Sequence, residues 1–300
     1  MFVIIGFVLL IGCVVVGFAM AAGGGHGLGE MIANMNFGAI GGLVHANEFI
    51  SLGGMVFGSM IIMAPIKVIK GVFAQVLGTL KGTPYSKEDY EELMKCMYEL
   101  FQLGRRGGMI ALEEHVMNPE GSSLFSKYPK FHGNHHALEF LCDALRPIVD
   151  GRLKPDQLPP LLNKSLHVME EEHHEPIFVM QNVGDALPAF GIVAAVLGII
   201  VVMMYRLGGD TTLVGQGIAT ALAGTFFGIF GSYCVIAPVK INCEFIGHAE
   251  MVYMKCIKEG VLSFANGLPP LVACEVARRV LTEDVRPSAG DLETMLKTSS

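Results

Sequence analysis

Four long apolar stretches restrict the possible folds of this chain more than any other feature of its sequence. A helix needs about 20 mostly apolar residues to cross the hydrocarbon core of a membrane. Hydrophobic residues make up 52% of the 300 residues and charged residues only 16%, which is too apolar for an ordinary soluble domain. The sequence therefore predicts an all-α membrane protein, whose four transmembrane helices span residues 1–22, 48–66, 188–206 and 214–238.

The distribution of positive charge predicts how these helices are oriented. None of the 21 Lys and Arg residues precedes Lys67, and all but one lie in the segments 67–187 and 239–300. Because basic loops stay on the cytoplasmic side, we expect both segments and both termini to be cytoplasmic. The Gly-rich loop 23–47 and the turn 207–213 are then periplasmic. The formal net charge of −7 argues against a nucleic-acid partner, which needs a basic face.

The first apolar stretch ends in Ala-Met-Ala at residues 19–21, which resembles a signal-peptidase site. No positive charge precedes the stretch, and it is long for the apolar part of a signal peptide. A retained helix is therefore favoured over a cleaved one. The seven cysteines are scattered and form no Cys-x-x-Cys pair, a pattern typical of reduced thiols.

The segment 67–187 is long enough for a large cytoplasmic domain, and its pattern is helical. Ser86 and Asp89 resemble a capping box, which predicts a helix immediately after Ser86. Two more helices are predicted over 134–150 and 155–175, the second leading directly into the third membrane helix. In the helix after Ser86, apolar residues recur at helical spacing and are expected to form its buried face: Tyr90, Leu93, Met94, Met97, Leu100 and Phe101.

Membrane helices three and four carry faces of small residues, which let another helix approach closely. The pairs are Gly191 with Ala195, Ala194 with Gly198, Gly217 with Ala221, and Gly224 with Gly228. Helix two has Gly54 and Gly58 at the same spacing. We expect helices three and four to pack tightly, either with each other or with a partner.

Helices three and four have no titratable group near the middle of the membrane, although proton transport through lipid normally requires one. Glu48 lies at the outer start of helix two, and Asp185 lies just outside helix three. If the protein passes ions, the carboxylate that carries them must come from another chain. Pro188 is predicted in the first turn of helix three, with Asp185 near the cap. Thr225 in helix four is expected to bond back to its own helix.

Two clusters of histidine and glutamate raise the question of a metal site. One contains His132, His135 and His136, and the other runs from residue 170 to 175. Neither repeats a ligand motif such as His-Glu-x-x-His, and both lie in polar sequence where such side chains are normally solvated. We expect no metal, no cofactor and no enzymatic activity. A membrane metalloenzyme is the alternative that these clusters leave open.

The chain contains four longer motifs. They are GDALPAFGIVAAVLG (184–198), AGTFFGIFGSY (223–233) followed by Pro238, GRRGGMIALEEHVMNP (104–119), and FANGLPPLVACEVARRVL (264–281) followed by Arg286-Pro287-Ser288. They resemble, in that order, the third-helix, fourth-helix, cytoplasmic-loop and tail motifs of the flagellar motor stator subunit family, motility protein A (MotA). The resemblance runs from about Glu48 to the end. The outer loop 23–47 departs from it, because it is longer and richer in glycine than in the family.

The resemblance implies a ring of five such chains in the bacterial inner membrane, around two copies of a partner, MotB. The single membrane helix of that partner supplies a proton-binding aspartate. Proton flow past the aspartate turns the ring, and the cytoplasmic loop pushes the rotor protein FliG. By the same resemblance, Pro188 and Pro238 couple ion flow to conformational change, and Ala195 and Thr225 line the ion path.

Two further roles follow from the resemblance. Arg105 and Glu113 match the charged pair that meets the rotor, whereas by themselves they are ordinary solvated charges. In sodium-driven members a threonine stands where this chain has Ala195. A dehydrated sodium ion needs oxygen ligands that an alanine methyl cannot supply, so the translocated ion is expected to be the proton. The alternative function is a TolQ- or ExbB-like energiser of envelope proteins, whose known members have three membrane helices.

Overall fold

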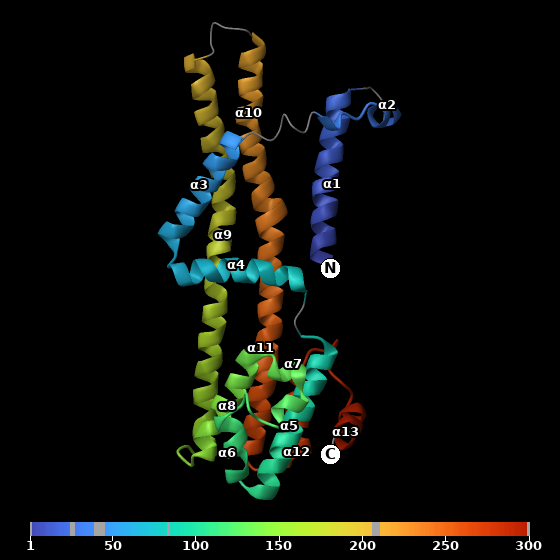
Figure 1. The fold of residues 1–300 in the computed structure, drawn as a ribbon, viewed down its shortest axis with the longest axis vertical. Coiled ribbons are helices and arrows are strands. Elements are labelled where there is room, and N and C mark those ends of the chain that lie inside the picture. Colours follow the sequence, from blue (N-terminus) through green and yellow to red (C-terminus); the bar gives the residue numbers. More distant parts are fainter. Residues whose placement is uncertain (1, 25–27, 39–45, 83–84, 206–210, 299–300) are drawn as a thin grey trace. The chain divides into compact units, whose positions relative to one another are not determined.

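The computed structural model describes residues 2–24, 28–38, 46–82, 85–205 and 211–298, which form helices and no strand (Figure 1). These residues divide into two compact units. The membrane unit combines Met1–Gly82 with His174–Glu244, and the helical domain combines Thr83–His173 with Phe245–Ser300. Part of the predicted loop 23–47 and most of the predicted turn 207–213 lie outside the described residues.

The membrane unit contains the apolar helices. Its long helices are α1 (Phe2–Gly23), α3 (Ala46–Met63), α9 (Leu158–Tyr205) and α10 (Thr211–Phe230). Within the described part of the chain, four helices are long and apolar enough to cross a membrane, which confirms the four predicted spans. Two shorter helices accompany them, α2 (Leu28–Ala33) within the predicted outer loop and α4 (Ile66–Lys81) directly after α3.

Small residues set the contact between α9 and α10, which run side by side (Figure 1). A Cβ atom added at Gly191 would lie 2.8 Å from the carbonyl oxygen of Gly224, and one added at Gly228 would lie 2.7 Å from the carbonyl oxygen of Leu187. Backbone atoms cannot yield easily at such distances, so glycine is required for this separation. The predicted tight packing of helices three and four is confirmed, and the two helices pack with each other.

The third membrane helix does not begin at Pro188, as the sequence suggested. α9 continues through this proline, so Pro188 lies inside a helix and Asp185 is not a cap. The preceding turns stay helical because their apolar residues, including Ile177 and Val183, are buried in a small core of the membrane unit. Pro188 lacks the N–H that would bond the carbonyl of Gly184, which makes it a weak point in a long helix.

The fourth span does not end at Pro238 either. α10 passes into a π-helical turn, η4 (Gly231–Ile236), and continues as α11 (Ala237–Ala265). The N–H of Ala237 donates to the carbonyl of Ser232, five residues earlier. A π-helical turn shifts the hydrogen-bond pairing by one residue, which accommodates the missing N–H of the proline within a continuous helix. Pro238 therefore follows a wide turn and is not a helix end.

The helical domain has one hydrophobic core. Its helices are α5 (Lys87–Gly107), α6 (Ile110–Met117), η2 (Phe125–Lys127), α7 (Pro129–His132), α8 (His135–Val149), η3 (Pro155–Gln157), the first turns of α9, most of α11, α12 (Pro270–Arg278) and α13 (Ala289–Lys297). The predicted capping box of α5 is present, and the Ser86 N–H donates to the Asp89 carboxylate over 2.7 Å. All six residues predicted for the buried face of α5 are buried.

The C-terminal segment 239–300 is not a separate tail, because α11 to α13 share the core of the helical domain with α5 and α8. The Phe264 ring stacks on Phe101 with centroids 4.6 Å apart. Gly104 leaves space for this ring, since an added Cβ would lie 2.7 Å from Phe264. The segment 67–187 is likewise not the whole domain, and α4 belongs to the membrane unit. Neither segment buries its apolar face alone, so the two fold together.

An ion pair in α12 makes the stability of the helical domain depend on pH. The Arg278 guanidinium donates to the two carboxylate oxygens of Glu275 over 2.7 and 2.6 Å, and to the Pro287 carbonyl over 2.8 Å. These hydrogen bonds hold the pKa of Glu275 below its usual range. A carboxyl whose pKa is lowered by folding stabilises the fold above its unfolded pKa of about 4.3, and this contribution is lost as the pH falls through the folded pKa.

We therefore expect Glu275→Gln to lower the free energy of unfolding by about 1–2 kcal/mol at neutral pH, and to have almost no effect in acid, where Glu275 itself is protonated. Urea unfolding of the detergent-solubilised protein at the two pH values measures this. Glu293→Gln is the matched control, because its ion pair with Lys297 is exposed and contributes little. An equal loss at both pH values would contradict the assignment.

Candidate functional site

A cavity of about 380 Å³ lies between α3, α9 and α10 in the membrane unit. Its apolar lining comes mainly from α9, with small residues at the α9–α10 contact. Its polar lining groups are Asn47, Glu48 and Ser51 on α3 and Gln216 and Thr220 on α10. A partly polar cavity between apolar membrane helices is suited to water and small ions.

Glu48 is the buried acid of this cavity, with only 5% of its surface exposed. A Cβ atom added at Gly224 on α10 would collide with its Oε2 atom, and one added at Gly198 on α9 would lie 3.8 Å from its Oε1 atom. The sequence predicted Glu48 at the start of a helix and assigned it no role. The structure brings its carboxylate onto the small faces of α9 and α10, a contact between distant segments that no spacing in the sequence reveals.

The predicted path residues Ala195 and Thr225 lie on the packed α9–α10 pair. Ala195 is buried and Thr225 is half-buried. The Thr225 Oγ1 atom lies 3.5 Å from the carbonyl oxygen of Gly191, so this hydroxyl points across to α9, whereas the sequence predicted a bond to its own helix. Neither residue lines the cavity at Glu48. Their part in an ion path stays a prediction.

The two predicted coupling prolines have different surroundings. Pro188 is half-buried and follows Leu187, whose carbonyl contacts Gly228. Pro238 is exposed and lines a second cavity of about 360 Å³, which also contacts α1 through residues such as Phe7. Each proline lies at an irregular point of a long helix, where a bend requires the least change in hydrogen bonding. Their coupling role stays a prediction.

In the helical domain, the predicted rotor residues Arg105 and Glu113 are both exposed, near the end of α5 and in the first turn of α6. The Arg105 Nη1 atom donates to the carbonyl of Gly267 over 3.1 Å, which fixes the guanidinium against the turn after α11. Exposure is compatible with a solvated face and with a docking surface. The rotor contact therefore also stays a prediction.

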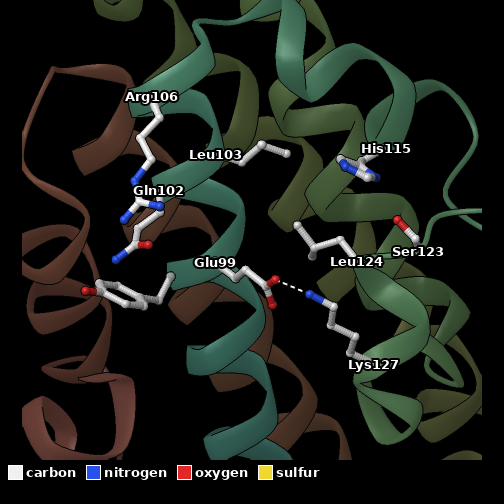
Figure 2. Close-up of a pocket in the computed structure, with 9 residues that line it drawn as sticks. Glu99, Gln102, Leu103, Arg106, His115, Ser123, Leu124 and Lys127 are labelled. Carbon is white, nitrogen blue, oxygen red and sulfur yellow. Dashed lines mark hydrogen bonds and ion pairs between the residues drawn. The ribbon is translucent and has the colours of Figure 1, made fainter. Parts of the chain in front are cut away.

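Arg106, which is chemically equivalent to Arg105 in the sequence, lines a pocket of about 300 Å³ in the same domain (Figure 2). Glu99 and Lys127 form an ion pair in this pocket, and the Tyr128 hydroxyl donates to the other oxygen of Glu99 over 2.9 Å. Burial, together with the bond to Glu99, raises the pKa of Tyr128. The two arginines thus differ in their surroundings, although the sequence could not separate them.

The histidines of the two clusters lie on α7, α8 and α9. Over the residues that the structure describes, no group of three or more His, Cys, Asp or Glu side chains is placed to hold a metal ion. His135 is the first residue of α8, whose cap Asn134 accepts a hydrogen bond from the Ala137 N–H. In the second cluster, the His173 Nδ1 atom lies 3.9 Å from the Glu250 Oε2 atom.

Comparison with known proteins supplies the family. Residues 31–108 match the model for the motility protein A N-terminal region, and residues 133–242 match the model for the MotA/TolQ/ExbB proton channel family. The chain is 31% identical over 293 residues to motility protein A of Salmonella typhimurium, covering 98% of this chain and 94% of that protein. The chain belongs to the motility protein A family.

Other relatives of the chain agree with this family. The chemotaxis protein LafT of Vibrio parahaemolyticus is 33% identical over 259 residues, covering 86% of this chain and 90% of LafT. The MotAB structure from C. jejuni has the same fold, with a TM-score of 0.72 at 22% identity, over 95% of this chain and 97% of that one. The predicted family is confirmed, and a role in motility is favoured over the TolQ- or ExbB-like alternative because these full-length relatives are motility and chemotaxis proteins.

Proposed function

We propose that this protein is the proton-driven stator subunit of a bacterial flagellar motor. The observation that carries the proposal is the match to motility protein A over almost the whole chain. The fold is also that of the flagellar MotAB stator complex of Bacillus subtilis, with a TM-score of 0.68 at 22% identity. The partly polar cavity between α3, α9 and α10 adds a feature that a simple membrane anchor does not need.

The proposed topology places both termini and the helical domain in the cytoplasm and the α9–α10 turn in the periplasm. The positive charges of the sequence support it. In this orientation the inner-membrane potential supplies about 2.3 kcal/mol per proton per 100 mV. When many protons pass in succession, that free energy is enough to shift a structural element between two conformations.

The proposed assembly is a ring of five copies around two copies of a MotB-type partner. Gly54 and Gly58 on α3 support an oligomer, because a Cβ atom added at either would have no described atom within 4 Å in this chain. Such open small-residue faces accept another membrane helix or lipid. The partner supplies the proton-binding aspartate, Ala195 and Thr225 line the path, and Pro188 and Pro238 let α9 and the α10–α11 helix bend.

Removal of the gene tests the stator function. We expect cells that lack this chain to assemble flagella and to lose swimming completely, because nothing then couples ion flow to the rotor. Electron microscopy counts the filaments, tracking measures swimming, and a plasmid copy of the gene restores motility. Swimming that persists in a clean deletion would overturn the proposal, and loss of envelope integrity without loss of swimming would favour the TolQ- or ExbB-like alternative.

The proposed contact with the rotor protein FliG uses Arg105 and Glu113. We expect Glu113→Lys to reduce motor torque at least about twofold, because a like charge at a docking surface repels its partner. Proton conduction should be unchanged, since Glu113 lies in the helical domain. Tethered-cell rotation measures torque. Glu114→Lys, at an equally exposed neighbouring position, is the control, and an equal or larger effect there would show that the pair was assigned to the wrong residues.

A further inference from the structure

The cavity at Glu48 combines a buried carboxylate with a polar lining, and both are rare between membrane helices. Glu48 is 5% exposed, and the cavity measures about 380 Å³. Its other polar groups are neutral and come from two helices, Asn47 and Ser51 on α3 and Gln216 and Thr220 on α10. A water molecule takes about 30 Å³ and needs two to four polar partners, so the cavity has space and bonding groups for several waters.

Glu48 is the only ionisable residue among the described residues that line this cavity. α3 has no other acidic or basic residue, and α10 has none at all. From α9, only apolar residues such as Leu197 and Val201 face the cavity. A carboxylate inside a membrane is costly to keep, and acidic residues in such positions typically mark proton or ion pathways.

Two glycines of α9 and α10 leave space for the Glu48 carboxylate. Gly224 leaves the space that the Glu48 Oε2 atom occupies, and Gly198 adjoins the Oε1 atom. Thr225 directly follows Gly224, and its contact Gly191 lies seven residues before Gly198, which is about 10 Å along α9. The carboxylate therefore lies on the same helix pair as the predicted ion path, against Gly224 beside Thr225 and against Gly198, which follows Ala195 by three residues.

We propose that Glu48 is the outer proton-binding station of this channel, which takes a proton from the cavity on the periplasmic side and passes it toward the aspartate of the partner helix. In each event the carboxylate gains one proton and then loses it, and no other bond forms or breaks. This inference rests on the proposed function, because it requires a proton current and the predicted outward orientation of the start of α3.

Proton flux through the complex of this chain with its MotB-type partner, reconstituted in vesicles, tests the station. We expect Glu48→Gln to reduce the flux at least about tenfold when the outer side is alkaline, because a positioned acid typically speeds proton transfer by that much or more. The deficit should shrink at acidic outer pH, where protons reach the partner aspartate without a relay. Glu48→Asp should keep most of the flux, and Gly224→Ala should resemble Glu48→Gln because its methyl group fills the carboxylate's space.

Glu30→Gln, in the exposed α2, is the matched control and should leave the flux unchanged. If Glu48→Gln conducts protons as fast as the wild type at both pH values, the proposed role of Glu48 is overturned. The stator function would then still be supported by a deletion strain that cannot swim. A deletion strain that swims would overturn the stator function itself. If Glu48→Gln fails to accumulate, treatment of the wild-type complex with an apolar carbodiimide decides. A carbodiimide adduct on Glu48 supports a protonated carboxyl in the cavity, and its absence counts against one.

Discussion

Gly228→Leu is expected to abolish swimming and to destabilise the membrane unit by about 3 kcal/mol or more. Gly228 faces backbone on two sides, since an added Cβ would lie 2.7 Å from the carbonyl oxygen of Leu187 and 2.9 Å from the Cα atom of Gly191. A leucine side chain can fit only if α9 and α10 separate. That separation also pulls apart the helices that hold Thr225 and the cavity at Glu48.

Gly215→Leu is the matched control, because Gly215 lies on the same helix and an added Cβ would have no described atom within 4 Å. Thermal unfolding in detergent and swimming speed are measured for both variants. We expect Gly215→Leu to resemble the wild type in both assays. A stable, motile Gly228→Leu variant would show that α9 and α10 do not pack as described.

Proton conduction is expected only when the partner is present. The membrane part of α9 after Asp185 and the whole of α10 carry no acidic residue, lysine, arginine or histidine. Glu48 lies beside Gly198 and Gly224 of this helix pair, so the second carboxylate that the proposed path requires must come from another chain. We expect vesicles with this chain alone to leak protons no faster than empty vesicles, and vesicles with the complex to conduct under a membrane potential.

Fluorescent pH indicators inside the vesicles measure the proton current, and a partner variant with asparagine in place of its membrane aspartate should abolish it. A sodium gradient without a proton gradient should drive no current, because Ala195 offers no oxygen ligand. Full conduction by this chain alone would contradict the need for a partner. A sodium current through the complex would contradict only the inference from Ala195.

Local sequence patterns determined the helices and much of their packing. The four spans follow from apolar length, the start of α5 follows from Ser86 and Asp89, and its buried face follows from helical spacing. The small-residue faces around Gly191 and Gly228 also predicted close packing correctly. These features depend on residues within one or two helical turns, whose physical preferences a short stretch of sequence carries.

Only the tertiary structure decided where helices continue and which distant residues meet. Pro188 and Pro238 read as helix boundaries, yet both lie within continuous helices. Here burial of neighbouring apolar residues and a π-helical turn outweigh the local preference of proline. The C-terminal segment joins the core around Phe101, and the Glu48 carboxylate reaches Gly224. Such contacts join residues more than a hundred positions apart, so their free energy comes from the folded arrangement, and the sequence near either residue contains no sign of it.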